Sequence, residues 1–224
     1  MSFPAAVIFD MDGTLIETEK TWDDVRRGLA ADEGLEWPEG ATQAMMGMST
    51  KEWATYLSDT VGLSGTWEDA ARRTIDGMSE AYRAGLPVLP GAVEAVRRMA
   101  AAFPVAIASS SPRRLIDLAV DELGIGELLA TTVSTEEVER GKPSPDGYLR
   151  AAELLGVDPA RCVAVEDSSN GIKSALAAGM AVVAVPPDFH PPADDLLAEC
   201  TVIDSLDELT EELVRTLHER SDDE

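Results

Sequence analysis

Five short apolar runs recur along the chain, and the last four alternate with helical patterns. The runs are AAVIFD (5–10), PVAIASS (104–110), LLATTVS (128–134), CVAVED (162–167) and AVVAVP (181–186). Continuous apolar runs of this kind are typical of strands that are buried on both faces of a sheet. Helical patterns with apolar residues three and four apart cover residues 92–102, 112–124, 145–156 and 169–179. This alternation predicts an α/β fold, a parallel sheet with helices on both sides.

The segment after the first run breaks this rhythm. Residues 15–89 separate the first run from the next helix of the sheet, although a crossover needs only about 12 residues. The segment has helical patterns almost throughout, and Trp22, Val25 and Leu29 share one face of the first of them. We therefore expect an all-helical cap domain over residues 17–86. It would be inserted into a core domain that residues 1–16 and 87–224 form, with two adjacent linkers between the domains.

Composition limits the partners and the location of the protein. The formal net charge is −24, from 42 acidic and 18 basic side chains, and such a surface repels nucleic acid and anionic membranes. The first residues lack a secretory signal pattern, and no apolar run reaches the ~20 residues of a membrane span. Two cysteines are too few for a disulfide framework. We expect a soluble, cytoplasmic monomer that binds neither nucleic acid nor membranes.

Polar residues gather where the predicted strands end. Asp10 and Asp12 follow the first run, Ser109 and Ser110 end the second, Lys142 follows the third, and Glu166 and Asp167 end the fourth. Each feature has an ordinary structural explanation as a turn, a helix cap or a solvated pair. Because parallel strands place ligands beyond their carboxyl ends, the four features would meet at one edge of the sheet. Their coincidence there favours a functional site.

These residues carry a resemblance to a known family. Asp10-Met11-Asp12-Gly13-Thr14, Ser109, Lys142-Pro143 and Glu166-Asp167 stand in the order and spacing of the four motifs of the haloacid dehalogenase superfamily. The stretches GKPSPDGY (141–148) and EDSSNGIKSALAAGM (166–180) resemble the β-phosphoglucomutase-like branch, whose small helical cap is inserted after the first motif. The resemblance covers nearly the whole chain. It implies a Rossmann-like core and phosphoryl transfer.

The negative charges of these residues also indicate a metal ion at the ends of the strands. A phosphate dianion that approaches these carboxylates meets repulsion of ~1 to ~4 kcal/mol for each close pair of charges. A hard cation such as Mg²⁺, which prefers oxygen ligands, removes this repulsion. By resemblance, the Mg²⁺ ligands would be Asp10, the backbone carbonyl of Asp12, and Asp167, with Glu166 bound directly or through water. Lys142 supplies a second positive charge and would bind the phosphate.

The resemblance and the chemistry assign roles to the remaining motif residues. Ser109, Ser110 and the amides at the start of the following helix would hold the phosphate, with Ser111 as the cap of that helix. Asp10 would be the nucleophile that forms an aspartyl-phosphate, and Asp12 would protonate the leaving group and then activate water. Dehalogenases lack an aspartate at the place of Asp12, so its presence indicates a phosphorylated substrate.

The cap is harder to interpret. Six residues there are possible substrate contacts: Thr18, Trp22, Gly47, Lys51, Arg72 and Arg73. Three of them are cations, Lys51, Arg72 and Arg73. For at least two of these, a position on a solvated helix face is the favoured explanation. The nearby Met45, Met46 and Met48 could line a substrate pocket, but packing in the core of the cap is favoured.

We predict a Mg²⁺-dependent phosphatase that hydrolyses a small phosphorylated metabolite, a sugar or polyol phosphate. The alternative enzyme is a sugar-phosphate mutase of the β-phosphoglucomutase type. Trp22 stands where the resemblance implies a histidine in that mutase, and this favours the phosphatase. A signalling receiver domain fits less well, since receivers have about 120 residues and no inserted cap. An inactive binding scaffold would not require all of the motif residues present here.

Overall fold

The computed structural model describes residues 4–46, 48–188 and 191–217. Its core is a parallel six-stranded sheet in the order β3-β2-β1-β4-β5-β6. The strands are β1 (Ala6–Phe9), β2 (Val105–Ser109), β3 (Thr131–Ser134), β4 (Cys162–Glu166), β5 (Ala181–Ala184) and β6 (Thr201–Val202). Each of the five apolar runs contains one strand. β6 has only two residues and therefore no pattern to detect in the sequence. The predicted α/β fold is confirmed.

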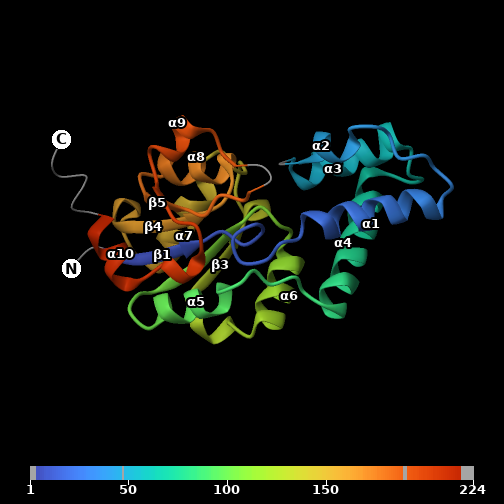
Figure 1. The fold of residues 1–224 in the computed structure, drawn as a ribbon. Coiled ribbons are helices and arrows are strands. Elements are labelled where there is room, and N and C mark those ends of the chain that lie inside the picture. Colours follow the sequence, from blue (N-terminus) through green and yellow to red (C-terminus); the bar gives the residue numbers. More distant parts are fainter. Residues whose placement is uncertain (1–3, 47, 189–190, 218–224) are drawn as a thin grey trace.

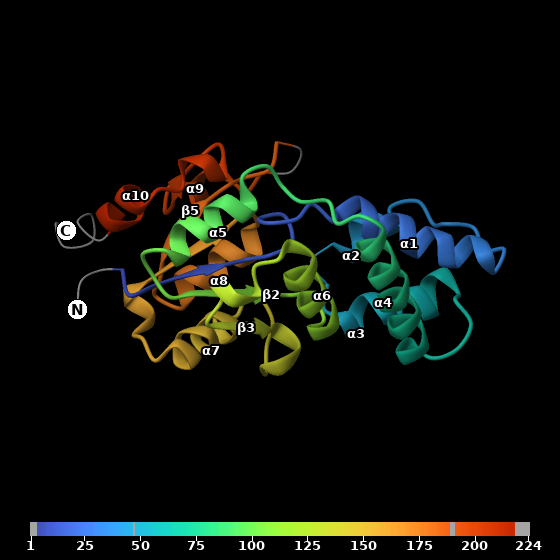
Figure 2. The same cartoon turned by 90° about the horizontal axis from the view of Figure 1, so that it is seen from below.

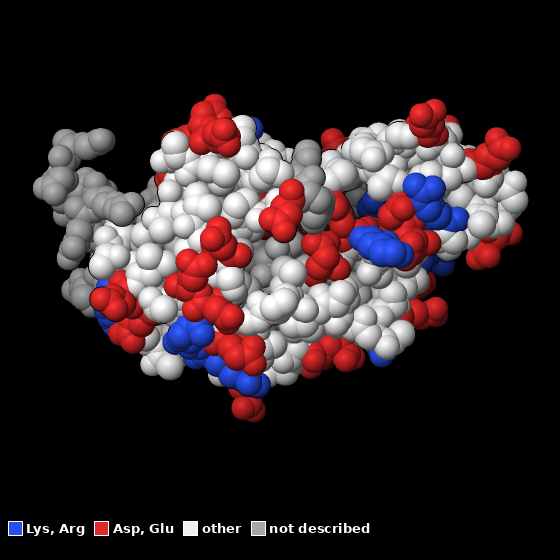
Figure 3. Space-filling model, viewed as in Figure 1, with Lys and Arg blue, Asp and Glu red and all other residues white. Residues whose placement is uncertain are grey.

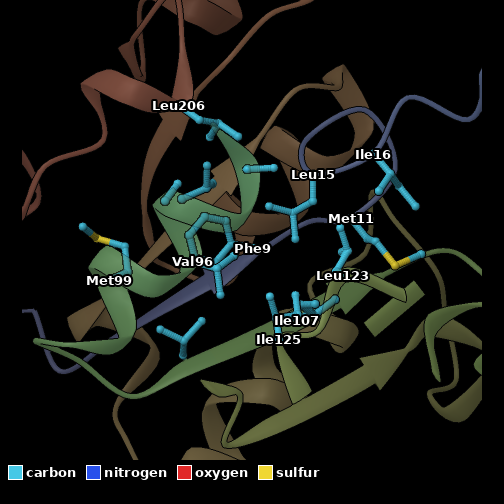
Figure 4. Close-up of a cluster of buried hydrophobic side chains, with 14 of the residues drawn as sticks. Phe9, Met11, Leu15, Ile16, Val96, Met99, Ile107, Leu123, Ile125 and Leu206 are labelled. Carbon is cyan, nitrogen blue, oxygen red and sulfur yellow. The ribbon is translucent and has the colours of Figure 1, made fainter. Parts of the chain in front are cut away.

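Helices cover both faces of the sheet. They are α5 (Ala92–Ala100), α6 (Arg113–Leu123), α7 (Asp146–Leu155), α8 (Ser169–Ala177), α9 (Asp194–Leu197) and α10 (Glu211–Thr216). Val7 and Phe9 of β1 pack with α5, α6 and α10, whereas Ala6 and Ile8 pack with α7, α8 and α9. Figure 4 shows Phe9 and Ile107 of the sheet facing Val96 of α5. Each large apolar side chain buried here contributes about 1.5–3 kcal/mol, so both faces of the central strand are firmly fixed.

The helices between β1 and α5 form a separate group. They are α1 (Glu19–Asp32), α2 (Ala41–Met45), α3 (Thr50–Tyr56), a π-helical turn (Leu57–Val61) and α4 (Trp67–Ala84). Figures 1 and 2 show this group at one end of the molecule, with α10 at the other end. The group has its own apolar cluster, in which Trp53, Leu57 and Leu63 are buried. The predicted all-helical insertion is therefore present, while the exact domain boundaries stay a prediction.

The two connections between the helical group and the sheet lie side by side. The amide of Glu17 donates to the carbonyl of Pro87 at 2.8 Å, and the amide of Leu89 donates to the carbonyl of Leu15 at 2.9 Å. Ile16 and Val88 pair as an antiparallel bridge between them. The chain thus leaves and re-enters the core through one short double strand.

The described helices include none that combines the length and the apolar character of a membrane span. The longest, α4, carries charged side chains along its whole length. It packs instead on α1 and, in Figures 1 and 2, lies beside α6. Asp76 of α4 and Arg114 of α6 form an ion pair at 2.5 Å, which links the helical group to the core.

Two glycine substitutions test the packing of α1 on α4. A Cβ on Gly77 would lie 2.8 Å from Cγ1 of Val25, whereas a Cβ on Gly28 would meet no atom within 4 Å. Gly28→Ala should raise the free energy of unfolding by about 0.5–1 kcal/mol, because alanine is the better helix former. Gly77→Ala should lower it by about 1–3 kcal/mol through overpacking. Urea denaturation measures both. A similar gain from each substitution would contradict the close packing.

Candidate active site

The order of the strands brings the motif residues together. β1 lies between β2 and β4, and its last residue, Phe9, pairs with Ile107 on one side and Val165 on the other. The next residues along these three strands therefore lie at one edge of the sheet, where Asp10 follows β1 and Glu166 ends β4. The strand order reverses at β1, because the chain runs from β1 outward through β2 to β3 and then crosses to β4 on the other side of β1. Open α/β sheets bind ligands at such a point.

Three carboxylates meet at this edge. Asp10, Glu166 and Asp167 are buried, and each offers an oxygen atom within 4.8 Å of the others. The loop after β1 makes room for them through Gly13, which has a φ of +92°. A Cβ on Gly13 would lie 2.2 Å from Oδ2 of Asp167. Only glycine suits this position, on grounds of both backbone conformation and space.

A single buried ammonium group lies among the three carboxylates. Nζ of Lys142 donates to Oδ1 of Asp10 at 2.5 Å and to Oε1 of Glu166 at 2.6 Å. The hydroxyl of Tyr148 also donates to Oε1 of Glu166, at 2.7 Å, and the hydroxyl of Ser168 donates to its Oε2 at 3.2 Å. Both oxygen atoms of Glu166 are thus occupied by protein donors. Within the described residues, Oδ2 of Asp10 has no such donor.

Burial controls the protonation of the cluster. It raises the pKa of Asp10 well above its usual range, and the negative charges of Glu166 and Asp167 add to this effect while Lys142 opposes it. Burial, followed by the charge of Glu166, raises the pKa of Asp167 to about 7. Burial alone would lower the pKa of Lys142, but the charges of Asp10 and Glu166 outweigh it and raise that pKa, so the ammonium keeps its proton.

The cluster fits a divalent cation. Three carboxylates surround one ammonium group, so the fully ionised site carries an excess of two negative charges. An oxygen-rich site of this charge suits Mg²⁺. Among the described residues, Oδ2 of Asp10 and Oδ2 of Asp167 accept no side-chain hydrogen bond, so each could bind a cation directly, whereas the donors on Glu166 favour a contact through water. This arrangement agrees with the ligand set expected from the sequence, which stays a prediction.

Asp12 has different surroundings from Asp10. Its carboxylate is only half-buried and accepts hydrogen bonds from the hydroxyls of Thr18 at 2.6 Å, Ser111 at 2.7 Å and Ser109 at 3.3 Å. Tyr82 of α4 adds a longer contact at 3.5 Å. The paired aspartates therefore face different partners, an ammonium group for Asp10 and hydroxyls for Asp12. This difference suits two different chemical roles.

The contact with Asp12 overturns one prediction. Ser111 was expected to cap the helix that follows it, but α6 begins at Arg113 after Pro112 and has no side-chain cap. The hydroxyl of Ser111 points to Asp12 instead, and the Ser111 amide donates to Oγ of Ser109 at 3.0 Å. Capping of α6 and the contact with Asp12 compete for the hydroxyl group of Ser111. In this structure the hydroxyl donates to the Asp12 carboxylate.

One cavity of about 980 Å³ joins the sheet edge to the cap. Residues of the core and of the cap line it together: Asp10, Asp12, Ser109, Ser110, Lys142, Asp167, Thr18, Trp22, Arg26, Met45, Met46, Met48, Lys51 and Trp53. Oγ1 of Thr50 in α3 donates to Oε1 of Glu136 in the core at 2.8 Å, and both of these residues also line the cavity. Figure 3 shows acidic side chains spread over both lobes of one face of the molecule.

The structure brings some of the predicted cap residues to this cavity and not others. Thr18, Trp22 and Lys51 line it. Arg72 and Arg73 do not line it and form ion pairs elsewhere, with Asp69 and Glu33. Gly47 lies outside the described residues. The three methionines line the cavity, and Met45 is also buried within the cap.

Several residues at the site were not found from the sequence. Tyr148 lies inside the GKPSPDGY stretch, and Tyr82 belongs to the end of α4, far from any motif. Arg26 lies one turn after Trp22 on the buried face of α1. Arg26 follows Trp22 by four residues, so it stands on the apolar face of the predicted helix. A charged residue at such a position was the signal in the sequence that could have identified it. No sequence pattern pointed to Tyr82.

Comparison with known proteins points to one family. The family model of haloacid dehalogenase-like hydrolases matches residues 4–179. The chain belongs to this family. Hexitol phosphatase A of Escherichia coli is 34% identical to the hydrolase over 215 residues, which cover 91% of this chain and 92% of the relative.

Two further comparisons agree with the family. The bifunctional riboflavin kinase/FMN phosphatase of Arabidopsis thaliana is 34% identical over 184 residues, which cover 81% of the hydrolase but only 48% of that relative. The hydrolase thus spans about half the length of this relative. The crystal structure of β-phosphoglucomutase from Clostridium difficile superposes with a TM-score of 0.80, at 22% identity and with 99% of each chain covered. This last likeness shows the shared fold.

Gly13→Ala tests the close approach of the loop to Asp167. The positive φ costs a non-glycine residue ~1–2 kcal/mol, and the added methyl group would displace the Asp167 carboxylate. We expect kcat/KM to fall roughly 100-fold, as for misplaced active-site groups. Gly156→Ala is the matched control, since Gly156 also has a positive φ but an added methyl group there would meet no atom within 4 Å. It should lose similar stability and keep its activity; equal losses of activity would contradict the assignment.

The raised pKa of Asp167 predicts a pH-dependent metal affinity. With a pKa of about 7, this carboxyl group is mostly protonated at pH 6 and mostly ionised at pH 8. Because Mg²⁺ binds the ionised form, its affinity should rise roughly tenfold between these pH values, and binding should release protons near neutral pH. Calorimetric titration in buffers of different ionisation enthalpy measures both effects. An affinity that is constant from pH 6 to pH 8 would contradict the prediction.

Proposed function

We propose that the protein is a Mg²⁺-dependent phosphatase that hydrolyses a small sugar or polyol phosphate through an aspartyl-phosphate on Asp10. The family match and the phosphatase relatives confirm the coarser prediction, a haloacid dehalogenase-like phosphoric monoester hydrolase. The observation that carries the proposal is the pair of aspartates in one cavity, with Asp10 beside Lys142 and Asp12 held by hydroxyls.

The metal would be held by Asp10, Asp167 and the backbone carbonyl of Asp12, with Glu166 acting through water. When bound, Mg²⁺ supplies the positive charge that lets a phosphate dianion approach the carboxylates. Lys142 adds a fixed charge at Asp10, and Tyr148 and Ser168 hold Glu166 so that this ammonium group stays in place. The site thus neutralises the substrate without strong attraction at long range, which the acidic surface could not provide.

Asp10 attacks the phosphorus atom from its free carboxylate oxygen. The bond between phosphorus and the ester oxygen breaks, and Asp12 gives its proton to the leaving alkoxide. Asp12, now ionised, then takes a proton from a water molecule that attacks the phosphorus of the aspartyl-phosphate. Phosphate leaves and both aspartates return to their starting state. Ser109 and Ser110 line the same cavity and would hold the phosphate oxygens.

The cap would control water at the site. In this proposal residues 17–86 form the cap domain, and residues 1–16 and 87–224 form the core domain on which it closes. The paired linkers at Glu17 and Leu89 would act as the hinge. The contact between Thr50 and Glu136 joins the two domains at the cavity. Closure over a bound substrate would shed bulk water and admit the hydrolytic water.

The substrate class rests on relatives and on the cavity. Hexitol phosphatase A, as its name states, acts on a hexitol phosphate, and it matches this chain over nearly its whole length. The cavity has the size of sites that enclose small metabolites, which are roughly 300–1,000 Å³. A sugar-phosphate mutase is the second candidate, since the fold is that of β-phosphoglucomutase. Trp22 offers no imidazole for proton transfer, and this favours the phosphatase.

Two substitutions separate the roles of the aspartates. Asp10→Asn should keep the fold and reduce turnover to background, because the amide is a poor nucleophile. Asp12→Ala should slow hydrolysis of alkyl phosphates by about 10²–10⁴-fold and that of p-nitrophenyl phosphate much less, since p-nitrophenolate leaves without a proton. Steady-state kinetics with circular dichroism as the fold control measures both. Residual activity of Asp10→Asn, or equal losses for both leaving groups in Asp12→Ala, would reject the assigned roles.

A substrate panel tests the proposed function itself. Phosphate release with Mg²⁺ should be followed across sugar, polyol and nucleoside monophosphates, with isomerised sugar phosphates measured in the same samples. Release from one or a few sugar or polyol phosphates supports the phosphatase. Isomerisation without release would identify a mutase, and no reaction with any compound would reject both activities.

A further inference from the structure

Arg26 is a buried cation in the wall of the active-site cavity, on the side of the cap. Only 9% of the residue is exposed. Its guanidinium carbon lies 4.8 Å from the ring centroid of Trp22 and 5.0 Å from that of Trp53. Its Nε has no hydrogen-bond partner, and within the described residues Arg26 forms no ion pair. Neither the motifs nor the proposed mechanism gives this side chain a role.

A buried charge of this kind is costly for the free protein. Burial lowers the pKa of Arg26 to about 10, so the side chain is still a cation at neutral pH. The indole rings of Trp22 and Trp53 offset part of the cost through cation–π contacts. They do not accept the in-plane N–H groups as an oxygen atom would. The folded protein thus holds a desolvated donor without an acceptor.

None of the other charged side chains described in the cavity wall forms an ion pair with Arg26. Asp23 is close in sequence and lines the cavity, but its carboxylate binds Arg27 at 2.6 Å and the hydroxyl of Thr42. Lys142 is paired with Asp10 and Glu166. Lys51 is exposed and lies 5.8 Å from the ring centroid of Trp67. The charge of Asp23 partly offsets the effect of burial on the pKa of Arg26, but among the described residues of the wall Arg26 is the buried cation that forms no ion pair.

The chemistry of the missing partner follows from the side chain. A guanidinium group presents a planar fork of N–H donors, which matches a carboxylate or a phosphate with two parallel hydrogen bonds. A neutral hydroxyl would accept one hydrogen bond and leave the charge unbalanced. The remaining wall is rich in acidic side chains, including Glu17, Glu52 and Glu139, so an anion in the cavity needs a cation close to it.

We propose that Arg26, bracketed by Trp22 and Trp53, binds a second anionic group of the substrate, a carboxylate or a phosphate at the end remote from the transferred phosphoryl group. This inference rests on the proposed phosphatase function and narrows its substrate class. The natural substrate is then a sugar or polyol phosphate that also carries a carboxylate or a second phosphate, rather than a simple polyol monophosphate. Arg26 is the specificity-determining residue, and Asp10 acts on the phosphoryl group at the other end.

A matched series of substrates tests the proposal. Sorbitol 6-phosphate, 6-phosphogluconate and sorbitol 1,6-bisphosphate share one carbon chain and differ at the first carbon, which carries a hydroxyl group, a carboxylate or a phosphate. The readout is the ratio of kcat/KM for each anionic compound to kcat/KM for sorbitol 6-phosphate. This ratio should exceed about 10 for at least one of them in the unsubstituted protein, and which one it is separates carboxylate from phosphate recognition.

Three variants complete the test. Arg26→Met should lower the ratio roughly 10- to 100-fold, the loss expected for a charge-assisted hydrogen-bonded pair. Any general loss of activity cancels in the ratio. Arg26→Lys keeps the charge and should retain part of the preference. Lys20→Met removes a cation from the exposed face of the same helix, where Lys20 pairs with Asp24, and should leave the ratio unchanged.

The outcomes separate this inference from the proposed function. Hydrolysis of sorbitol 6-phosphate and p-nitrophenyl phosphate without any preference for the anionic compounds would overturn the role of Arg26 and leave the phosphatase standing. A preference that survives in Arg26→Met would overturn it as well. Absence of phosphate release from every compound, including p-nitrophenyl phosphate, would overturn the phosphatase and the inference together.

Discussion

Repulsion among three buried carboxylates is the constraint on which the rest of this structure depends. Asp10, Glu166 and Asp167 are held within 4.8 Å of one another, and Lys142 balances only part of their charge. The surrounding structure keeps them together at a cost in stability. A Cβ on Gly171 would lie 1.9 Å from the carboxylate oxygens of Glu166, so the first turn of α8 needs a glycine at this position. A site with this excess of negative charge is arranged for a cation and a phosphate.

The sheet supplies the rigidity that this arrangement needs. β1 lies at its centre with apolar clusters on both faces, so the backbone that carries Asp10 and Asp12 is fixed by packing on every side. The cap is attached differently, through the two paired linkers, through polar contacts such as Thr50 with Glu136, and through α4, whose Met78 and Tyr82 pack in the same apolar cluster as Phe9. The carboxylates of the site are thus held by the core, whereas Trp22 and Arg26 belong to the inserted helical group.

The sequence predicted the fold well and the site in part, for physical reasons. Continuous apolar runs predict strands that are buried on both faces of a sheet. Because Asp10, Ser109 and Glu166 stand where these strands end, their position at one edge of the sheet follows from the strands alone. Side-chain hydrogen bonds are not periodic, so the turn of Ser111 toward Asp12 instead of α6 could not be anticipated. From the sequence, a solvated helix face was the expected place of at least two of the cations Lys51, Arg72 and Arg73. Arg72 and Arg73 proved to be paired with carboxylates away from the cavity, and the buried Arg26 escaped notice within an apolar face.

The central claim is that the phosphoryl group passes through Asp10 at a site that needs a divalent cation. Rapid acid quenching during turnover, followed by mass spectrometry of the peptide that contains Asp10, tests this claim directly. With Mg²⁺ and a substrate, we expect a phosphoryl group on Asp10 that is absent when the metal is removed by a chelator and absent in Asp10→Asn. Turnover that proceeds with a phosphoryl group on another residue, or at an undiminished rate without a divalent metal, would contradict it.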